Sequence, residues 1–453
     1  MKLLNFDEKK RYINFFLVII FFLSINRLDI SIQIKTIAVI LFGLIYYQYL
    51  PELRNLSFSQ NYSTLTLLFI FFIFTQNQFL NYETVSLDVP SYLVASQNVG
   101  LSELPLEKQW ESKGPLFMYL YNLFSYFAQD HLVYFKLLND ILLFLVVIIL
   151  FYTILSNTGK KPNSLIGSLI FVSLLSYVWY HSEFSEIYCL LFISFHFYYL
   201  NRNHLNTKTL FISSLLLSFS TLINQATFIF YISFLFLILR KKARFLNIKE
   251  IFYISIGSFL PHLIFIILYL QQGLINLYIS NYLYLPLNYV GSDKFKSNEL
   301  FVWLKRYFEF NELLYFSLIL IFVFFIFKIF NNLYDIFNEK IVFNILIYLI
   351  ASFLIYVIAG HSYEHHLFYS IYFISLFTSV FFNEKQINMI GLIVVISAVQ
   401  IFISSFSLSY NNLSNIDDVY NDYPLHQLSK EIDMIFDDQD YTVLAFDHVL
   451  LLY

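Results

Sequence analysis

The chain has 453 residues, of which 58% are hydrophobic and only 13% are charged, and its mean hydropathy is +0.65. This composition is typical of polytopic membrane proteins and excludes the soluble globular and disordered classes. The formal net charge of −4 is too small for a nucleic-acid-binding surface, so we expect no nucleic-acid partner. A single cysteine, Cys189, provides neither a disulfide framework nor a cysteine-based metal site.

The apolar segments predict an all-α protein with about 11 to 13 transmembrane helices. The first segment follows Lys9, Lys10 and Arg11 and has no small-residue cleavage site after it, so we interpret it as a retained helix. The segments 208–223 and 226–240 either form two helices or merge into one. The expected spans are roughly 12–26, 34–50, 63–80, 132–156, 163–180, 184–200, 208–223, 226–240, 251–270, 311–330, 340–359, 365–382 and 387–406.

Lys and Arg are concentrated in alternate short loops between these spans, and the positive-inside rule assigns such loops to the cytoplasm. The N-terminus is therefore expected in the cytoplasm, with the loops 81–131 and 271–310 on the external face. We divide the chain into a transmembrane domain, 1–406, and an external tail, 407–453. The tail has the pattern of a short helix followed by a strand, a small α/β unit that either docks on the membrane domain or continues into a longer domain.

The expected cytoplasmic loops are short, at most about a dozen residues, whereas nucleotide-binding domains are built from βαβ units of about 30 residues each. The sequence also lacks a G-x-G-x-x-G fingerprint and a P-loop. An ATPase and an enzyme that uses cytoplasmic nucleotide sugars are therefore excluded. An activated sugar at the external face would have to arrive attached to a lipid.

The external loop 81–131 contains the strongest candidates for chemistry. Asp88 precedes Tyr92 by one helical turn, and the segment Lys113-Gly-Pro-Leu follows later in the same loop. An isolated carboxylate at a membrane surface is more often a solvated helix end than a functional group, but here it belongs to a pattern. Of the two acidic residues at the start of the loop, Glu83 and Asp88, only Asp88 has the D-x-x-x-Y spacing.

The segments LDVPSYLVA and KQWESKGPLFMYLYNLF resemble the first external loop of GT-C glycosyltransferases of the protein O-mannosyltransferase and aminoarabinose transferase type. In that family an Asp-Glu-x-x-Tyr segment is followed by Lys-x-Pro-Leu, the loop Asp lies at the catalytic centre, and the donor is a polyprenyl-phosphate sugar. The resemblance implies that Asp88 is the catalytic base and that transfer inverts the anomeric centre. It also implies that Tyr92 and Lys113 bind the donor, with Lys113 on its phosphate.

Two further segments are similar to parts of that family. SEFSEIY, 182–188, is similar to an external turn that often contains an acidic residue, which makes Glu186 a candidate for donor binding. Its neighbour Glu183 is expected to be solvated, as carboxylates at hairpin tips usually are. The chain departs from the family where Val89 replaces a second acidic residue and where Asn224-Gln225 stands in place of a frequent Lys.

The segment GHSYEHHLFYSIYFISLFTS, 360–379, is similar to a late family helix that begins with a His-Tyr pair. His361, His365 and His366 surround an acidic residue there, and His361 and His365 are one helical turn apart. Three roles are open for them: contact with phosphate or substrate, metal binding, and structural hydrogen bonding. Because no H-E-x-x-H order is present, we assign the three histidines to donor binding and predict neither metal ligands nor a divalent-metal cofactor.

These patterns predict an integral protein of the cell membrane that transfers a sugar from a polyprenyl-phosphate donor to an envelope glycan, lipid or protein on the external face. A base for the acceptor hydroxyl and a cation for the phosphate are the groups that such a reaction needs. The alternatives are a transporter or flippase of lipid-linked glycans and a non-catalytic subunit of an assembly complex. A transporter would have charged residues in the middle of several helices, and here Lys136 and Asp140 are the main ones, one turn apart and able to pair with each other.

Overall fold

The computed structural model describes residues 59–76, 88–96, 113–128, 132–176, 183–202, 205–242, 246–284, 339–358, 364–382 and 384–414, with shorter pieces within 99–107 and 302–326. Every regular element in these ranges is a helix, so the expected all-α fold is confirmed there. The helices expected at 12–26 and 34–50, and the helix and strand expected in the tail, lie outside the described residues.

Most of the long helices begin and end within a few residues of the expected spans. They are α3 (Ser59–Gln76), α6 (Leu132–Thr158), α7 (Lys161–Leu175), α8 (Ser185–Arg202), α9 (Thr207–Ile223), α10 (Phe228–Lys242), α11 (Ile248–Gln271), α16 (Lys340–Ile358), α17 (Phe368–Phe381) and α18 (Glu384–Ser414). Shorter elements connect them: α4 (Asp88–Ser96), α5 (Pro115–Ala128), η3 (Gln225–Thr227), α12 (Ile275–Tyr278), the π-helix η4 (Ile279–Tyr284) and the 3₁₀-helix η5 (Glu364–Leu367).

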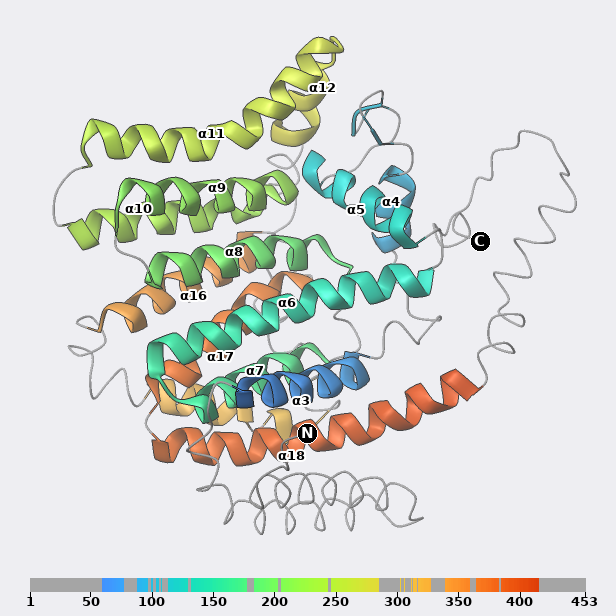
Figure 1. The fold of residues 1–453 in the computed structure, drawn as a ribbon, viewed down its shortest axis with the longest axis vertical. Coiled ribbons are helices and arrows are strands. Elements are labelled where there is room, and N and C mark those ends of the chain that lie inside the picture. Colours follow the sequence, from blue (N-terminus) through green and yellow to red (C-terminus); the bar gives the residue numbers. More distant parts are fainter. Residues whose placement is uncertain are drawn as a thin grey trace, which may run out of the picture.

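The long helices lie side by side, from α11 at one edge through α9, α8, α6 and α7 to α18 at the other (Figure 1). A second row consists of α10, α16 and α17, which packs on α9, α6 and α7. The elements α4, α5 and α12 gather at one end of this bundle (Figure 1). The connections α6–α7, α8–α9 and α10–α11 lie at the opposite end.

The segments 208–223 and 226–240 form two helices, because Asn224 ends the first and begins the next element. Its extended backbone (φ −143°, ψ 116°) stops α9, and its side-chain oxygen accepts a hydrogen bond from the backbone N–H of Ala226 at 3.1 Å. Asparagine is a preferred residue at helix N-caps because its short side chain satisfies a backbone donor that the helix leaves open. The turn therefore sets α10 antiparallel to α9.

The expected external loop 81–131 contains two helices, α4 and α5, which the hydropathy pattern did not separate from the loop. Pro115 occupies the first position of α5, where a missing backbone N–H costs nothing and the fixed φ suits a helix. Both helices bury an apolar side, with Tyr92 and Leu93 from α4 and Phe117 and Tyr121 from α5 in the core. The described helices of the loop, α4 and α5, are thus packed on the bundle.

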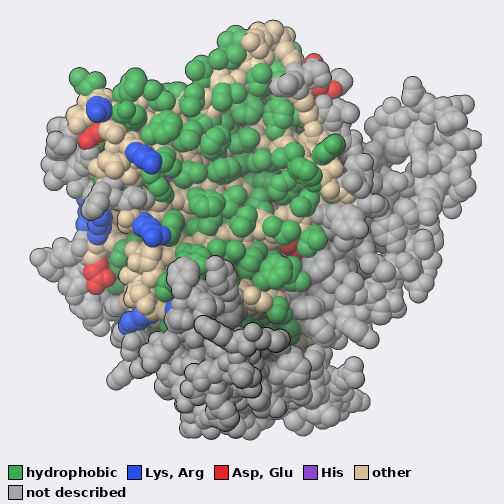
Figure 2. Space-filling view, in the orientation of Figure 1, with side chains coloured by type: hydrophobic (Ala, Val, Ile, Leu, Met, Phe, Trp, Pro, Cys, Tyr) green, Lys and Arg blue, Asp and Glu red, His purple; other side chains and the backbone are tan. Residues whose placement is uncertain are grey.

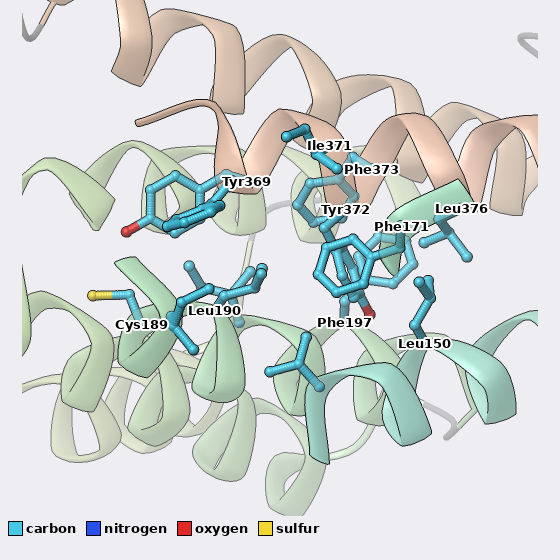
Figure 3. Packing of buried hydrophobic residues seen from close by; sticks show 14 of the residues in the cluster. Leu150, Phe171, Cys189, Leu190, Phe197, Tyr369, Ile371, Tyr372, Phe373 and Leu376 are labelled. Carbon is cyan, nitrogen blue, oxygen red and sulfur yellow. The ribbon is translucent and has the colours of Figure 1, made fainter. Parts of the chain in front are cut away.

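The interior between α6, α7, α8 and α17 is filled by large apolar side chains. Figure 3 shows Leu150, Phe171, Leu190, Phe197 and Tyr372 packed between these helices. Small residues let other helices approach more closely, as is common in membrane bundles. Between α9 and α11, the hydroxyl of Ser218 donates to the backbone carbonyl of Ser258 at 2.6 Å.

The outer surface matches a bilayer environment. Hydrophobic side chains cover the visible face of the helices, and Lys and Arg side chains gather along the edge where the α8–α9 and α10–α11 connections lie (Figure 2). Three helices in the described part are long and apolar enough by themselves to cross a membrane, and shorter apolar helices of 10–17 residues accompany them. The three are Phe135–Thr158, Ile248–Gln271 and Lys340–Ile358.

Candidate functional site

The segment before α5 is fixed against the end of α9 by its glycine. The backbone N–H of Gly114 donates to the carbonyl of Ile223 at 2.8 Å. A Cβ at Gly114 would lie 2.6 Å from the carbonyl carbon of Leu222 and closer still to its oxygen, so only glycine fits this approach. The contact places Lys113, one residue earlier, next to the turn that joins α9 to α10.

Glu186 forms the centre of the site. It lies in the first turn of α8 and is completely buried. Its Oε1 is 3.6 Å from Nζ of Lys113 and 3.3 Å from Nδ1 of His366, and it accepts a hydrogen bond from Nδ2 of Asn224 at 3.0 Å. Its Oε2 accepts a hydrogen bond from the hydroxyl of Ser185 at 3.1 Å. Four segments therefore meet at one carboxylate.

Aromatic rings lie beside Lys113 and beside the two histidines that surround this carboxylate. The ammonium of Lys113 lies 6.0 Å from the ring centroid of Tyr92, at the outer limit of a cation–π contact. The Tyr92 ring also makes an edge contact with Phe117, at 5.1 Å between centroids. On the other side, His365 stacks on Phe184 with centroids 4.5 Å apart and an interplanar angle of 17°.

The structure thus brings together five of the residues selected from the sequence: Tyr92, Lys113, Glu186, His365 and His366. Asp88 begins α4, one turn before Tyr92, but its side chain lies outside the described residues. His361 also lies outside them. The roles assigned to all seven residues remain predictions.

Glu186, His365 and His366 could also be considered as metal ligands, because one ligand atom from each lies within 4.8 Å of the others. The carboxylate oxygen that faces His366, however, is the one that faces Lys113 and accepts from Asn224. An ammonium group in this position would repel a divalent cation. The arrangement is therefore better suited to an anion that approaches Lys113 and the histidines.

Sequence reasoning missed Asn224, which stands where a Lys is frequent in the resembled family and here donates to Glu186. The sequence signal that could have indicated a role in the site was its position at the tip of the hairpin between two apolar segments. The expectation that Glu183 is solvated was wrong, because its side chain is 1% exposed. The interior of the bundle encloses it, and this burial raises the pKa of its carboxyl, which the charge of Lys136 opposes.

Lys136 and Asp140, one turn apart on α6, are also buried. These two side chains and that of Glu183 are at most 2% exposed. Lys136, Asp140 and Glu183 are thus further buried charged residues, and Glu183 lies three residues before Glu186.

No family model matches the sequence, and no curated protein matches it. A solved structure does: ArnT from Cupriavidus metallidurans bound to undecaprenyl phosphate, with a TM-score of 0.60. The alignment covers 88% of this chain and 85% of that chain at 9% sequence identity. The chain has the GT-C fold. At this identity the likeness shows the fold, and it confirms the GT-C architecture that the loop motifs predicted.

Proposed function

We propose that this GT-C protein is a glycosyltransferase that moves a sugar from a polyprenyl-phosphate carrier to an envelope glycan, lipid or protein. The observation that supports this proposal is the buried carboxylate of Glu186, whose Oε1 faces Nζ of Lys113 and Nδ1 of His366. The Lys113 side chain is 12% exposed, so it is held by its counter-ion and still open to a ligand. Binding of undecaprenyl phosphate by the structural neighbour supports a lipid phosphate as that ligand.

In this proposal Lys113 contacts a phosphate oxygen, and His365 and His366 approach the phosphate from the start of α17. Tyr92 covers Lys113, and Glu186 orients both Lys113 and His366. His361 is assigned to the same phosphate from the sequence pattern. Hydrogen bonds to charged groups contribute about 1.5–3 kcal/mol each, enough to hold a lipid headgroup at the membrane interface.

The reaction also needs a base, because the acceptor hydroxyl is protonated at neutral pH. We assign this role to Asp88, which takes the hydroxyl proton as the acceptor oxygen bonds to the anomeric carbon. The bond between that carbon and the phosphate oxygen breaks, and the polyprenyl phosphate leaves with the additional negative charge. Lys113 stabilises this charge, so we expect no dependence on a divalent metal.

The protein is integral to the membrane, as its fold and apolar surface indicate. We further propose that it resides in the cell membrane with its N-terminus in the cytoplasm and the Glu186 site at the external face. The support is the position of the site at the end of the bundle opposite the basic connections (Figures 1 and 2).

Sugar transfer from a polyprenyl-phosphate donor by purified full-length protein tests the proposal. Asp88→Asn keeps size and removes the charge, so transfer should fall by at least about 10²-fold, the usual minimum contribution of base catalysis. Lys113→Ala should weaken binding of undecaprenyl phosphate about tenfold or more. Glu103→Gln, in the same loop, should change transfer only a few-fold. EDTA should leave the wild-type rate unchanged. Unchanged transfer by Asp88→Asn together with unchanged binding by Lys113→Ala would refute the proposal.

The buried cluster of Lys136, Asp140 and Glu183 is the one observation that favours a transporter, because charges inside membrane bundles often mark transport pathways. The second candidate function is therefore translocation of a lipid-linked glycan. Proteoliposomes loaded with a fluorescent polyprenyl-phosphate sugar distinguish the two functions. Translocation without transfer to an acceptor would favour the transporter.

A further inference from the structure

The last turn of α9 has backbone carbonyls that the helix itself cannot use, because a helix leaves its final four C=O groups without an intrahelical partner. In α9 these groups belong to residues 220–223. The carbonyl of Ser220 accepts from the backbone N–H of Asn224 at 3.0 Å, and that of Ile223 accepts from the backbone N–H of Gly114 at 2.8 Å. Segments from elsewhere in the chain therefore dock on the end of α9 by completing its hydrogen bonds.

Tyr282 docks on the same turn from a distant part of the chain. It lies in the π-helix η4, in the described part of the loop 271–310, and it is 3% exposed. Its hydroxyl donates to the carbonyl of Thr221 at 2.6 Å. In addition, the side-chain amide of Gln225 donates to the backbone carbonyl of Tyr282 at 3.2 Å. Two hydrogen bonds thus join η4 to the end of α9 and the turn that follows it.

The ring of Tyr282 also lies against Gly114. A Cβ added at Gly114 would lie 3.1 Å from Cε2 of Tyr282, in addition to its clash with the carbonyl group of Leu222. The glycine is therefore confined between the backbone of α9 and the edge of this ring. Since Lys113 directly precedes Gly114, the two contacts together fix the backbone from which the Lys113 side chain extends.

The backbone of η4 directs this one aromatic side chain inward. Tyr282 is buried, whereas the next two residues, Leu283 and Tyr284, are 48% and 62% exposed. Tyr278, one turn earlier, stacks on the Tyr282 ring with centroids 5.1 Å apart and an interplanar angle of 28°. Single turns of π-helix are rare and occur frequently at functional sites. The ring is thus held by its own segment as well as by α9.

We infer that Tyr282 is a positioning residue for Lys113. Its hydroxyl on α9 and its ring on Gly114 hold the backbone that keeps Nζ of Lys113 3.6 Å from Oε1 of Glu186. This inference rests on the proposed function, in which Lys113 contacts the donor phosphate. It also connects the loop 271–310 to the donor site, because η4 lies in that loop. Tyr282 acts through Lys113 and does not need to contact the donor.

The test measures binding of undecaprenyl phosphate to the purified full-length protein in nanodiscs, together with the melting temperature. Tyr282→Leu removes both contacts, so affinity should fall towards that of Lys113→Ala, about tenfold below the wild type. Tyr282→Phe keeps the ring on Gly114 and removes only the hydroxyl. Its affinity should therefore lie between those of the wild type and Tyr282→Leu.

A double-mutant cycle separates positioning from a general loss of structure. Residues that act through a shared contact deviate from additivity, whereas independent residues add. If Tyr282 acts through Lys113, the variant Lys113→Ala/Tyr282→Leu should bind no more weakly than Lys113→Ala. Additive losses of affinity would show that Tyr282 supports the site by another route, and they would overturn the inference.

The matched control is Tyr269→Leu, in the same aromatic cluster. Tyr269 is also buried, and its hydroxyl likewise donates to a backbone carbonyl, that of Pro105, at 2.5 Å. This variant should lower the melting temperature about as much as Tyr282→Leu does and leave affinity unchanged. An equal loss of affinity in both variants would mean that Tyr282 has only a structural role.

The reference variant Lys113→Ala separates the inference from the proposed function. Wild-type affinity in both Tyr282 variants, with weak binding in Lys113→Ala, would overturn the positioning role alone. Wild-type affinity in Lys113→Ala as well would overturn the donor site on which it rests. If Tyr282→Leu does not fold, Tyr282→Phe decides, because it retains the ring: unchanged affinity in that variant overturns the inference.

Discussion

The two ends of the helix bundle differ in the exposure of their lysines, although each end also buries a carboxylate, Glu250 at one and Glu186 at the other. At the α6–α7 and α8–α9 connections, Lys160 and Lys208 are exposed to solvent. At the other end, Glu186, Glu183 and Lys136 are buried within the helices. An exposed charge costs the fold little and can orient the protein in the membrane, whereas a buried charge has to be compensated by a partner. The buried end is therefore where charge has a specific geometric task.

The largest expected effect comes from removing the cation of the buried end. Lys136→Met takes away an ammonium group that is 2% exposed and lies one turn from the buried Asp140 on α6. Breaking a buried ion pair from one side typically costs about 3–5 kcal/mol, because the remaining charge stays in the interior. Unfolding by SDS titration should show this loss. The triple variant Lys136→Met/Asp140→Asn/Glu183→Gln should be more stable than Lys136→Met, and equal stability of the two would contradict the charge interpretation.

A smaller effect is expected at the backbone contact that places Lys113. Gly114→Ala puts a Cβ against the Leu222 carbonyl, where the neighbouring atoms are backbone and cannot rotate away. Overpacking of this kind typically costs about 1–3 kcal/mol. It should also displace Lys113 and weaken binding of undecaprenyl phosphate. Gly100→Ala is the control, since an added Cβ there meets no atom within 4 Å. Equal melting temperatures for both variants would show that the close approach does not exist.

The smallest effect is expected at the exposed end. Lys208→Ala removes a solvated charge and should change stability by less than about 0.5 kcal/mol, as surface substitutions usually do. The same end provides the topology test. In a Cys189→Ala background, a cysteine at Lys208 should react with an impermeant maleimide only from the cytoplasmic side, and one at Glu107 only from the external side. The reverse labelling pattern would invert the orientation and contradict an external site.

The sequence predicted the helices well because hydropathy is a local property, and spans such as 340–359 end where polar residues begin. It also selected Lys113, Glu186 and His366 separately, from motifs far apart in the chain. It did not predict that they meet at one carboxylate oxygen, because no local pattern contains the distance between helices. Asn224 was missed for the same reason: its amide acts on a residue of the preceding hairpin.

The error at Glu183 has a different cause. A carboxylate in a short turn between two apolar segments has the same local pattern whether it faces water or the interior. What decides between these is packing against elements distant in sequence, such as α5, where the hydroxyl of Tyr121 donates to the carbonyl of Glu183 at 2.6 Å. The helical part of the external loop was likewise not separated, since α4 has only 9 residues and its apolar side is defined by the bundle beneath it.

The burial of Cys189 provides an internal reporter of motion. Its thiol is enclosed between α8 and α9, where it donates to the carbonyl of Ser220 at 3.4 Å, one turn along α8 from Glu186. A thiol reagent can reach it only when these helices separate. The rate at which Cys189 of the natural chain reacts with such a reagent therefore measures how often α8 and α9 separate beside the site. No introduced cysteine is needed.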